Sequence, residues 1–114
     1  HNTGDEVIRM AARCIQSVVR DMDIVARFGG EEFCVILPGA SLETACAIAE
    51  RCREKIAAQV TNGVSVTSSF GVTARSLGAT TANELIHQAD QALYYSKQQG
   101  RNRVSKWTEI NPDA

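Results

Sequence analysis

Apolar residues recur every three or four positions along three stretches of the chain, a spacing typical of amphipathic helices. The first helix is predicted over residues 4–20, the second after Ser41, and the third after Thr81. The strings TGDE and TANE match the capping box, which predicts Thr3 and Thr81 as N-caps, and Ser41 is expected to cap the second helix. Gly100 is expected to follow the end of the third helix, because glycine tolerates the left-handed conformation there.

Between the helices the pattern changes to short runs of β-branched and aromatic residues, which predict strands. Residues 24–28 and 33–37 form two such runs, and the Gly-Gly pair at 29–30 between them favours a β-hairpin with the glycines near its tip. Alternation over residues 64–74 predicts a long strand, and residues 102–107 predict a last edge strand.

The order helix, hairpin, helix, strand, helix, strand mixes tight turns with crossover connections. This order predicts an α+β fold in which helices cover a largely antiparallel sheet. A chain of 114 residues suits one domain. We place that domain at residues 1–107 and expect a flexible tail at residues 108–114.

Composition excludes several classes of protein. The chain is 44% hydrophobic and 22% charged, which is too apolar for disorder, and no apolar run is long enough to span a bilayer. The net charge of −1 gives no positive field for a nucleic-acid polymer, although a few local cations can hold a small anion. The four cysteines lie in apolar-periodic segments without a CxxC pair, so we expect reduced core thiols and a cytoplasmic location. A membrane anchor elsewhere in a parent protein stays open.

The predicted hairpin carries the string RFGGEEF at residues 27–33, with two adjacent acids at its tip. Successive strand residues point to opposite faces, so Glu31 and Glu32 are expected to have different roles. Two interpretations stay open. The acids can lie in solvent and limit pairing between sheet edges. Alternatively, the glycines can admit a ligand against the backbone while a carboxylate offers oxygen to a Mg²⁺ ion that bridges phosphates.

The same string, with NTGDE before it and ADQALYYSKQQGRNRV near the C-terminus, resembles the GGDEF domain of diguanylate cyclases. The resemblance covers nearly all of residues 1–106, and Glu31 in place of the motif's aspartate is a common active variant. It implies a nucleotidyl-cyclase, polymerase-palm-like (ferredoxin-like) fold. The family pattern normally begins with a strand and helix that carry a metal-binding aspartate and a guanine-reading asparagine. Neither occurs here, so we expect a domain truncated at its N-terminus.

The resemblance implies that two copies, each holding GTP, meet as a homodimer and form cyclic di-GMP with release of two pyrophosphates. Glu31 would bind Mg²⁺ or Mn²⁺ and assist deprotonation of the attacking hydroxyl. Glu32 would bind the metal or support the site. Gly29 and Gly30 would leave room for the nucleotide beside the hairpin.

Three further residues match substrate-binding positions of the family. Asp5 would accept hydrogen bonds from N1–H and the exocyclic amine of guanine, a donor pair that adenine lacks. An acid in the first helical turn also suits the helix dipole, which is the alternative interpretation. Lys97 and Arg101 would contact the triphosphate, or their charges would serve the carbonyl groups at the helix end.

Arg20 and Asp23 form an RxxD string that five residues separate from Gly29, which is the spacing of the family's allosteric product site. A guanidinium can fork onto phosphate or guanine, and a carboxylate can accept from guanine. Arg51 matches a secondary cation of that site. The alternative is a surface ion pair with little energetic weight.

These expectations describe a diguanylate cyclase domain that is inhibited by its product and controlled by an N-terminal sensory or regulatory domain in its parent protein. We expect the 114-residue chain alone to be inactive. Two alternatives are a catalytically inert receptor for cyclic di-GMP and an inert dimerisation module. The presence of Asp5, Glu31, Lys97 and Arg101 argues against the receptor.

Overall fold

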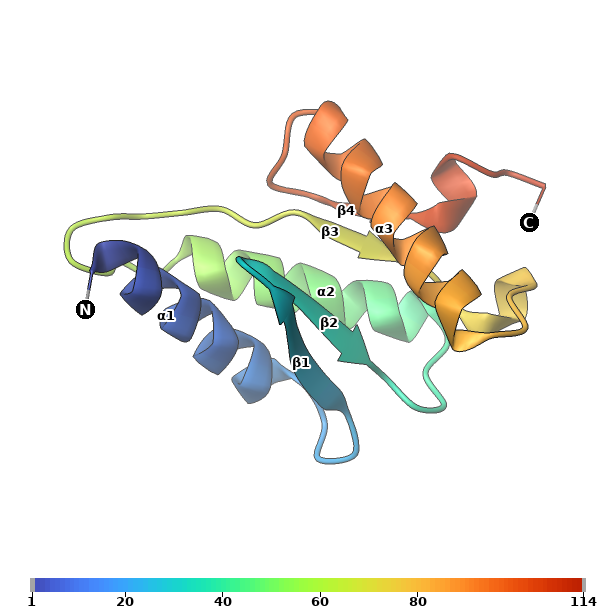
Figure 1. Ribbon diagram of the computed structural model, residues 1–114, viewed down its shortest axis with the longest axis horizontal. Helices are drawn as coiled ribbons and strands as arrows, with labels where there is room; N and C mark the ends of the chain where they lie inside the picture. The colour runs from blue at the N-terminus through green and yellow to red at the C-terminus, as the bar shows by residue number, and fades with distance from the viewer. Residues whose placement is uncertain (1, 114) are drawn as a thin grey trace.

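The elements of the chain follow the predicted order of helix, hairpin, helix, strand, helix and strand, which confirms the α+β class (Figure 1). The computed structural model describes residues 2–113. His1, the first residue of the predicted domain, and Ala114, the last residue of the predicted tail, lie outside the described residues. No helix in this range is long and apolar enough to cross a membrane. The elements are α1 (Thr3–Val18), β1 (Ile24–Gly29), β2 (Glu32–Ile36), α2 (Leu42–Ala57), β3 (Phe70–Val72), the 3₁₀ turn η1 (Arg75–Leu77), α3 (Ala82–Gln98), β4 (Val104–Lys106) and the 3₁₀ turn η2 (Trp107–Glu109).

Helix α1 begins one residue earlier than predicted, because Asn2 rather than Thr3 is its N-cap. The Asn2 side chain accepts a hydrogen bond from the backbone N–H of Asp5 at 2.8 Å, and asparagine is among the preferred N-cap residues. The predicted capping box is therefore wrong here. The Glu6 carboxylate accepts instead from the Asn62 side chain at 2.6 Å, which ties the start of α1 to the loop after α2.

The ends of the other helices agree more closely with the sequence. Ser41 caps α2, with its Oγ 3.1 Å from an N–H of the first turn. Thr81 caps α3 by accepting from the N–H of Glu84 at 3.1 Å, while the Glu84 carboxylate accepts from the N–H of Thr80 rather than from that of the cap. Gly100 follows the C-cap of α3 with a φ of 119°, the left-handed conformation predicted for it.

Strands β1 and β2 form the predicted antiparallel hairpin, with Arg27 opposite Phe33. The register shifts by a bulge between Arg27 and Gly29, just before the tip. Gly29 and Gly30 have φ values of 120° and 43°. Residues with a Cβ adopt such values rarely, so the two glycines allow the chain to turn here.

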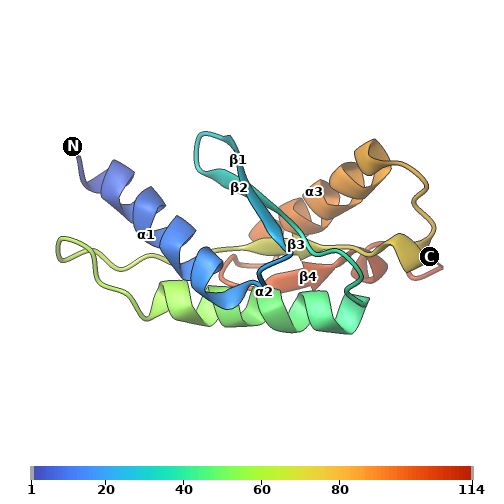
Figure 2. The same cartoon turned by 90° about the horizontal axis from the view of Figure 1, so that it is seen from below.

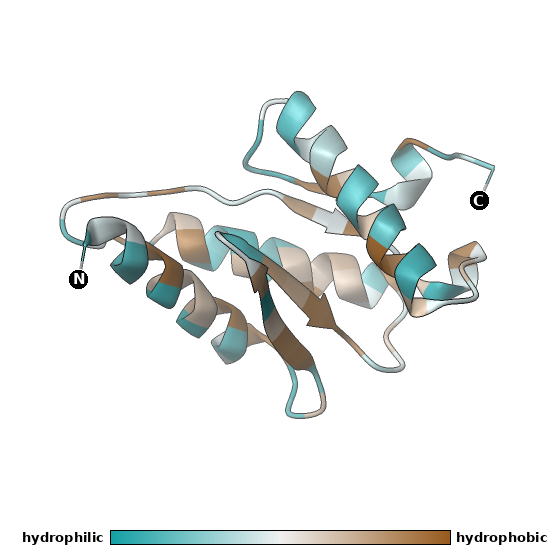
Figure 3. Ribbon diagram, in the orientation of Figure 1, coloured by the Kyte–Doolittle hydropathy of each residue, from teal (hydrophilic) through white to brown (hydrophobic). Residues whose placement is uncertain are grey.

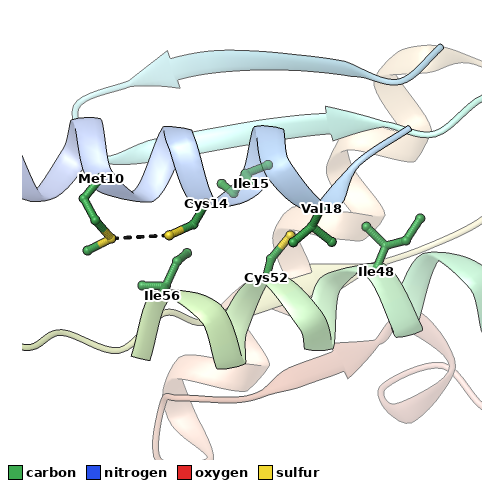
Figure 4. Close-up of a cluster of buried hydrophobic side chains, with 7 residues drawn as sticks. All are labelled: Met10, Cys14, Ile15, Val18, Ile48, Cys52 and Ile56. Atoms are coloured by element: carbon green, nitrogen blue, oxygen red, sulfur yellow. Dashed lines mark hydrogen bonds between the residues drawn. The ribbon is translucent and has the colours of Figure 1, made fainter. Parts of the chain in front are cut away.

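The main core lies between α1 and α2, whose apolar faces meet (Figure 4). Hydrophilic and hydrophobic residues alternate around α1 as this one-sided burial requires (Figure 3). Half-buried hairpin residues cover the cluster, among them Val25, Phe33 and Val35. The buried members of the cluster are Met10, Cys14, Ile15, Val18, Ile48, Cys52 and Ile56.

The four cysteines are free thiols, as predicted. Cys14 and Cys52 are buried in the core, whereas Cys34 and Cys46 are only half-buried. Burial raises the pKa of the Cys52 thiol to about 11, so this thiol stays protonated and unreactive near neutral pH.

Strands β3 and β4 lie between α2 and α3 (Figure 2). Gly71 of β3 lets α3 approach closely, since a Cβ at this position would clash with the backbone of Ala89 and Leu93. The buried Ser96 hydroxyl of α3 lies 2.7 Å from both the Phe70 carbonyl oxygen and the Ser105 hydroxyl. These polar contacts join α3 to both strands.

The predicted sheet differs in detail from the observed one. Strand β3 covers only Phe70–Val72 of the predicted residues 64–74, because residues 65–69 have no strand beside them in the part of the chain described. The last strand, Val104–Lys106, pairs with β3 in parallel, while the hairpin forms a separate antiparallel pair. The 3₁₀ turn η2 occupies the first residues of the predicted tail and packs on α3.

Candidate functional site

The tip of the hairpin presents two acids to solvent. Glu31 lies in the turn after Gly30, and Glu32 is the first residue of β2; both are exposed. Within residues 2–113 neither carboxylate makes a hydrogen bond or an ion pair. Both acids are therefore free to bind a cation.

The donors at the tip suit a magnesium ion that shares its coordination with phosphates. Magnesium is usually held by one or two carboxylates, with phosphates and water filling the other positions. No group of three or more His, Cys, Asp or Glu side chains that could enclose a metal occurs among residues 2–113. Glu31 and Glu32 are two exposed carboxylates, a number that can share in holding such an ion.

Asp5 lies in the exposed first turn of α1. Its backbone N–H bonds to the Asn2 side chain, so the N-cap is made without the Asp5 carboxylate. The position agrees both with an acid that stabilises the helix dipole and with an acid that reads a base.

Lys97 and Arg101 lie at the C-terminal end of α3. Lys97 is half-buried in the last turn, and Arg101 is exposed in the loop that follows. The carbonyl groups of the helix end are bonded by backbone N–H groups: that of Gln99 donates to Tyr95 at 2.9 Å and that of Arg101 to Ser96 at 3.0 Å. Neither cationic side chain bonds a terminal carbonyl in the described residues, so both charges remain available to a ligand.

The predicted substrate residues come from three segments of the chain: the first turn of α1, the hairpin tip and the C-terminal end of α3 with the loop after it. In both views the hairpin tip lies between the first turn of α1 and the C-terminal end of α3 (Figures 1 and 2). These segments carry Asp5, the two tip acids and the cations Lys97 and Arg101. A groove of about 500 Å³ lies elsewhere, on the outer face of α3, and contains none of these residues.

The RxxD string forms a hydrogen-bonded turn between α1 and β1, at the opposite end of β1 from the tip (Figure 1). The Arg20 guanidinium donates to both oxygens of Asp23, with Nη2 2.8 Å from Oδ1 and Nε 3.0 Å from Oδ2. The backbone N–H of Arg20 also donates to Asp23 at 2.7 Å, and Nη2 donates to the carbonyl of Pro38 at 3.0 Å. Hydrogen bonding from Arg20 lowers the pKa of Asp23, and the pairing raises the pKa of Arg20.

The two members of this pair differ in exposure. The Asp23 side chain is 0% exposed, while that of Arg20 is 34% exposed and can still meet a ligand. Arg51 is exposed on α2 and makes no hydrogen bond or ion pair with this turn in residues 2–113. Arg20 and Asp23 thus form an ion pair, and Arg51, the third residue predicted for this site, makes no contact with the pair through hydrogen bonds or charges in the described residues.

Two further arginines make contacts close in sequence to the predicted site residues. Arg27 closes the hairpin turn by donating from Nε to the carbonyl of Gly30 at 2.8 Å. Arg53 of α2 donates to the side chain of Asn102 at 2.8 Å, across 49 residues of sequence. The role of Arg27 was predictable from sequence, because Arg27 begins the RFGGEEF string. The contact between Arg53 and Asn102 was not, because no local pattern connects two residues 49 positions apart.

Comparison with known proteins identifies the family of the chain. Residues 1–103 match the sequence profile described as diguanylate cyclase, GGDEF domain. The chain is 41% identical over 109 residues to diguanylate cyclase A of Treponema denticola, covering 92% of this chain and 29% of that protein. It is 40% identical over 111 residues to diguanylate cyclase DosC of Escherichia coli K12, covering 94% of this chain and 24% of that protein. The chain therefore spans less than a third of the length of these curated relatives.

Solved structures place the fold in the same group. The active GGEEF domain of a diguanylate cyclase from Vibrio cholerae is similar with a TM-score of 0.85 at 33% identity, covering 94% of this chain and 70% of that one. The GGDEF domain of DgcB from Caulobacter crescentus, solved in complex with c-di-GMP, is similar with a TM-score of 0.87 at 33% identity, covering 94% and 66%. The predicted palm-like fold is confirmed. From the profile match, the identity to these relatives and the shared fold, the chain belongs to the GGDEF domain family of diguanylate cyclases.

Proposed function

We propose that this chain is the catalytic domain of a diguanylate cyclase, which condenses two GTP molecules into cyclic di-GMP and releases two pyrophosphates. The observation that carries the proposal is the hairpin tip. Its string is GGEEF, as in the active domain from Vibrio cholerae, and its two acids are exposed without partners in the described chain. Acids that only limit pairing between sheet edges would not require this string, whereas a metal-binding role uses both the glycines and the free carboxylates.

Each half of the reaction is a phosphoryl-type transfer. The 3′-oxygen of one GTP forms a bond to the α-phosphorus of the other GTP, the bond from that phosphorus to the β-phosphate oxygen breaks, and pyrophosphate leaves. Repeating the step in the other direction closes the ring, so two copies of the domain must face each other. Mg²⁺ or Mn²⁺, when bound with the nucleotide, neutralises charge on the phosphates.

The residues of the chain divide this work. Glu31 holds the metal and accepts the proton of the attacking hydroxyl, and Glu32 supports the same site. Gly29 and Gly30 leave space against the backbone, since a Cβ at either position has no neighbour within 4 Å. Alignment of the two nucleotides supplies a large part of the rate enhancement in such transfers.

Substrate recognition uses the residues on either side of the tip. Asp5 accepts from the two donors of guanine, and a site built to pair both donors rejects adenine by leaving the carboxylate unpaired. Lys97 and Arg101 bind the triphosphate. Their side chains make no hydrogen bond or ion pair with any other described residue, so their charges are available to phosphate.

The turn of Arg20 and Asp23, with Arg51, is proposed to bind the product and inhibit the enzyme. The exposed part of the Arg20 guanidinium can fork onto phosphate or guanine. A second candidate function is an inert receptor for cyclic di-GMP that uses the same turn, and the observation that favours it is the partly exposed Arg20 guanidinium. A receptor would need this turn but not the hairpin acids.

The test incubates a longer protein that carries this chain with GTP and Mg²⁺ and follows cyclic di-GMP and pyrophosphate. A cyclase gives both, with two pyrophosphates for each cyclic product. A receptor binds added cyclic di-GMP but forms none from GTP. A dimerisation module does neither, and that result would end the proposal of catalysis.

A further inference from the structure

The loop between α3 and β4 carries Arg101 in an unusual conformation. Gly100, Arg101 and Asn102 have φ values of 119°, 65° and 49° in succession. Residues with a Cβ adopt left-handed values rarely, and two in a row persist only where the surroundings hold them. Something other than local preference therefore maintains this loop.

Side chains from distant parts of the chain hold Asn102. Its side-chain oxygen accepts from Nη1 of Arg53 at 2.8 Å, and its backbone N–H donates to the hydroxyl of Ser69 at 3.2 Å. Asparagine suits this position, because its short amide tolerates the left-handed conformation better than most residues.

Arg53 is itself held in place. Its Nε donates to Oε1 of Glu50 at 2.8 Å, and its Nη2 pairs with the same carboxylate oxygen. The Arg53 side chain is only 21% exposed. The guanidinium is thus divided between a carboxylate on its own helix and the amide of Asn102, an arrangement that the planar fork of arginine allows and the single ammonium of lysine does not.

This arrangement leaves Arg101 free. Its backbone is bonded on both sides, since its N–H donates to the carbonyl of Ser96 at 3.0 Å and its carbonyl accepts from Nε of Arg103 at 3.1 Å. Its side chain is exposed and has no hydrogen-bond or ion-pair partner in residues 2–113. The loop is fixed while the guanidinium it carries is available.

We propose that Arg53 and Asn102 are positioning residues for nucleotide binding: their hydrogen bond holds the loop so that Arg101 meets the triphosphate of GTP. The inference rests on the proposed function, because it takes Arg101 as a phosphate ligand. Because the loop is already ordered, GTP binding does not have to order it. The free energy of binding is therefore not reduced by the loss of conformational entropy in the loop.

Three variants in a longer protein that carries this chain test the tether. Arg53→Lys keeps the charge but loses the fork, and Asn102→Gly keeps the left-handed backbone but loses the acceptor. Both are expected to raise KM for GTP about three- to tenfold with kcat and the melting temperature close to parental values. Arg75→Lys, at an exposed arginine of η1, is the matched control and should change nothing.

A double variant shows whether Arg53 acts through Arg101. If it does, Arg53→Lys raises KM in the parental background but has no further effect once Arg101→Ala is present. Hydrogen exchange should also quicken at the Asn102 amide in Arg53→Lys. An unchanged KM in Arg53→Lys, or independent effects of the two substitutions in the double variant, would overturn the inference. This holds even if hydrogen exchange at Asn102 becomes faster, because the loop would then be loosened without any effect on GTP binding. A parental protein that forms no cyclic di-GMP points to failure of the proposed function instead.

Discussion

At the scale of single residues, Glu31 is the clearest case of a side chain without a structural task. It is exposed in the turn, and no described residue bonds its carboxylate. Replacing Glu31 with Gln in a longer protein that carries this chain removes the charge but keeps the shape. We expect cyclase activity to fall at least about a hundredfold, because one metal ligand is lost.

The same variant should keep the melting temperature of the parent. Glu54→Gln, at an exposed acid of α2, is the matched control and should retain activity. Cyclic di-GMP synthesis by Glu31→Gln at a near-parental rate under saturating Mg²⁺ would show that the metal is held elsewhere.

Asp5 is the second residue whose carboxylate is available, because the N-cap uses only its backbone N–H. Replacing Asp5 with Ser leaves that N–H in place and offers adenine a donor as well as an acceptor. The preference for GTP over ATP should fall by about tenfold or more. Competition between the two nucleotides measures the ratio directly. If the variant discriminates as sharply as the parent, guanine is read by another residue and Asp5 serves the helix dipole.

At the scale of elements, the contact between α3 and β3 depends on Gly71. A Cβ there meets the backbone of Ala89 and Leu93, and backbone cannot move aside as a flexible side chain can. We expect Gly71→Ala to lower the free energy of unfolding by about 2–4 kcal/mol. Gly4→Ala is the control, since the new Cβ would face only the side chain of Asn2, at 3.2 Å, within a helix that favours alanine. Equal denaturant midpoints for the two variants would contradict this packing.

The turn between α1 and β1 carries the proposed product-binding residues Arg20 and Asp23. Arg20→Ala should weaken cyclic di-GMP binding by at least about tenfold and relieve inhibition, while initial rates stay unchanged, because the turn lies at the far end of β1 from the hairpin tip. Inhibition curves with added cyclic di-GMP measure the effect. If inhibition by cyclic di-GMP stays at the parental level, the ion pair of Arg20 and Asp23 stabilises the turn but does not bind the product.

The same variant should also change the response to acid. Arg20 holds the pKa of Asp23 below its ordinary value of 3.8, so the pair stabilises the fold above that pH and the stabilisation is lost as pH falls through the lowered pKa. Arg20→Ala leaves the buried Asp23 carboxylate without this partner. Its melting temperature should therefore drop most at neutral pH and approach the parental value in acid.

At the scale of the whole molecule, the hairpin leaves large apolar side chains in solvent. Ile24 and Ile36 are cross-strand neighbours that are 53% and 52% exposed, and Phe28 is 58% exposed. Figure 3 shows hydrophobic residues along both strands. Strand β2 pairs only with β1 in the described chain, so one of its edges is open as well. An apolar face beside an open edge favours association.

We therefore expect the isolated 114-residue chain to self-associate in a concentration-dependent way. Sedimentation velocity over a range of concentrations measures this, and Ile36→Lys, which places a charge on the open strand, should shift the population toward monomer. We also expect weak binding of Mg²⁺–GTP in a calorimetric titration, because the tip supplies few ligands. A monomer that binds GTP with micromolar affinity would contradict both expectations.

Much of the fold depended only on neighbours in sequence. Apolar spacing located the three helices, Ser41 and Thr81 marked two of their starts, and the Gly-Gly pair placed the hairpin tip. These features were predictable because a helical turn, a cap or a hairpin turn involves residues within about four positions of one another. The same locality let the RFGGEEF string and its companions indicate the family before any fold was known.

The tertiary structure alone decided which distant residues meet. Residues 65–69 alternate like a strand but remain unpaired, since a ladder needs a second strand and no local pattern supplies one. The burial of Asp23, the close approach at Gly71 and the bond from Arg53 to Asn102 each depend on elements brought together by packing. Sequence therefore determined the chemistry that the chain carries, and packing decided how that chemistry is held.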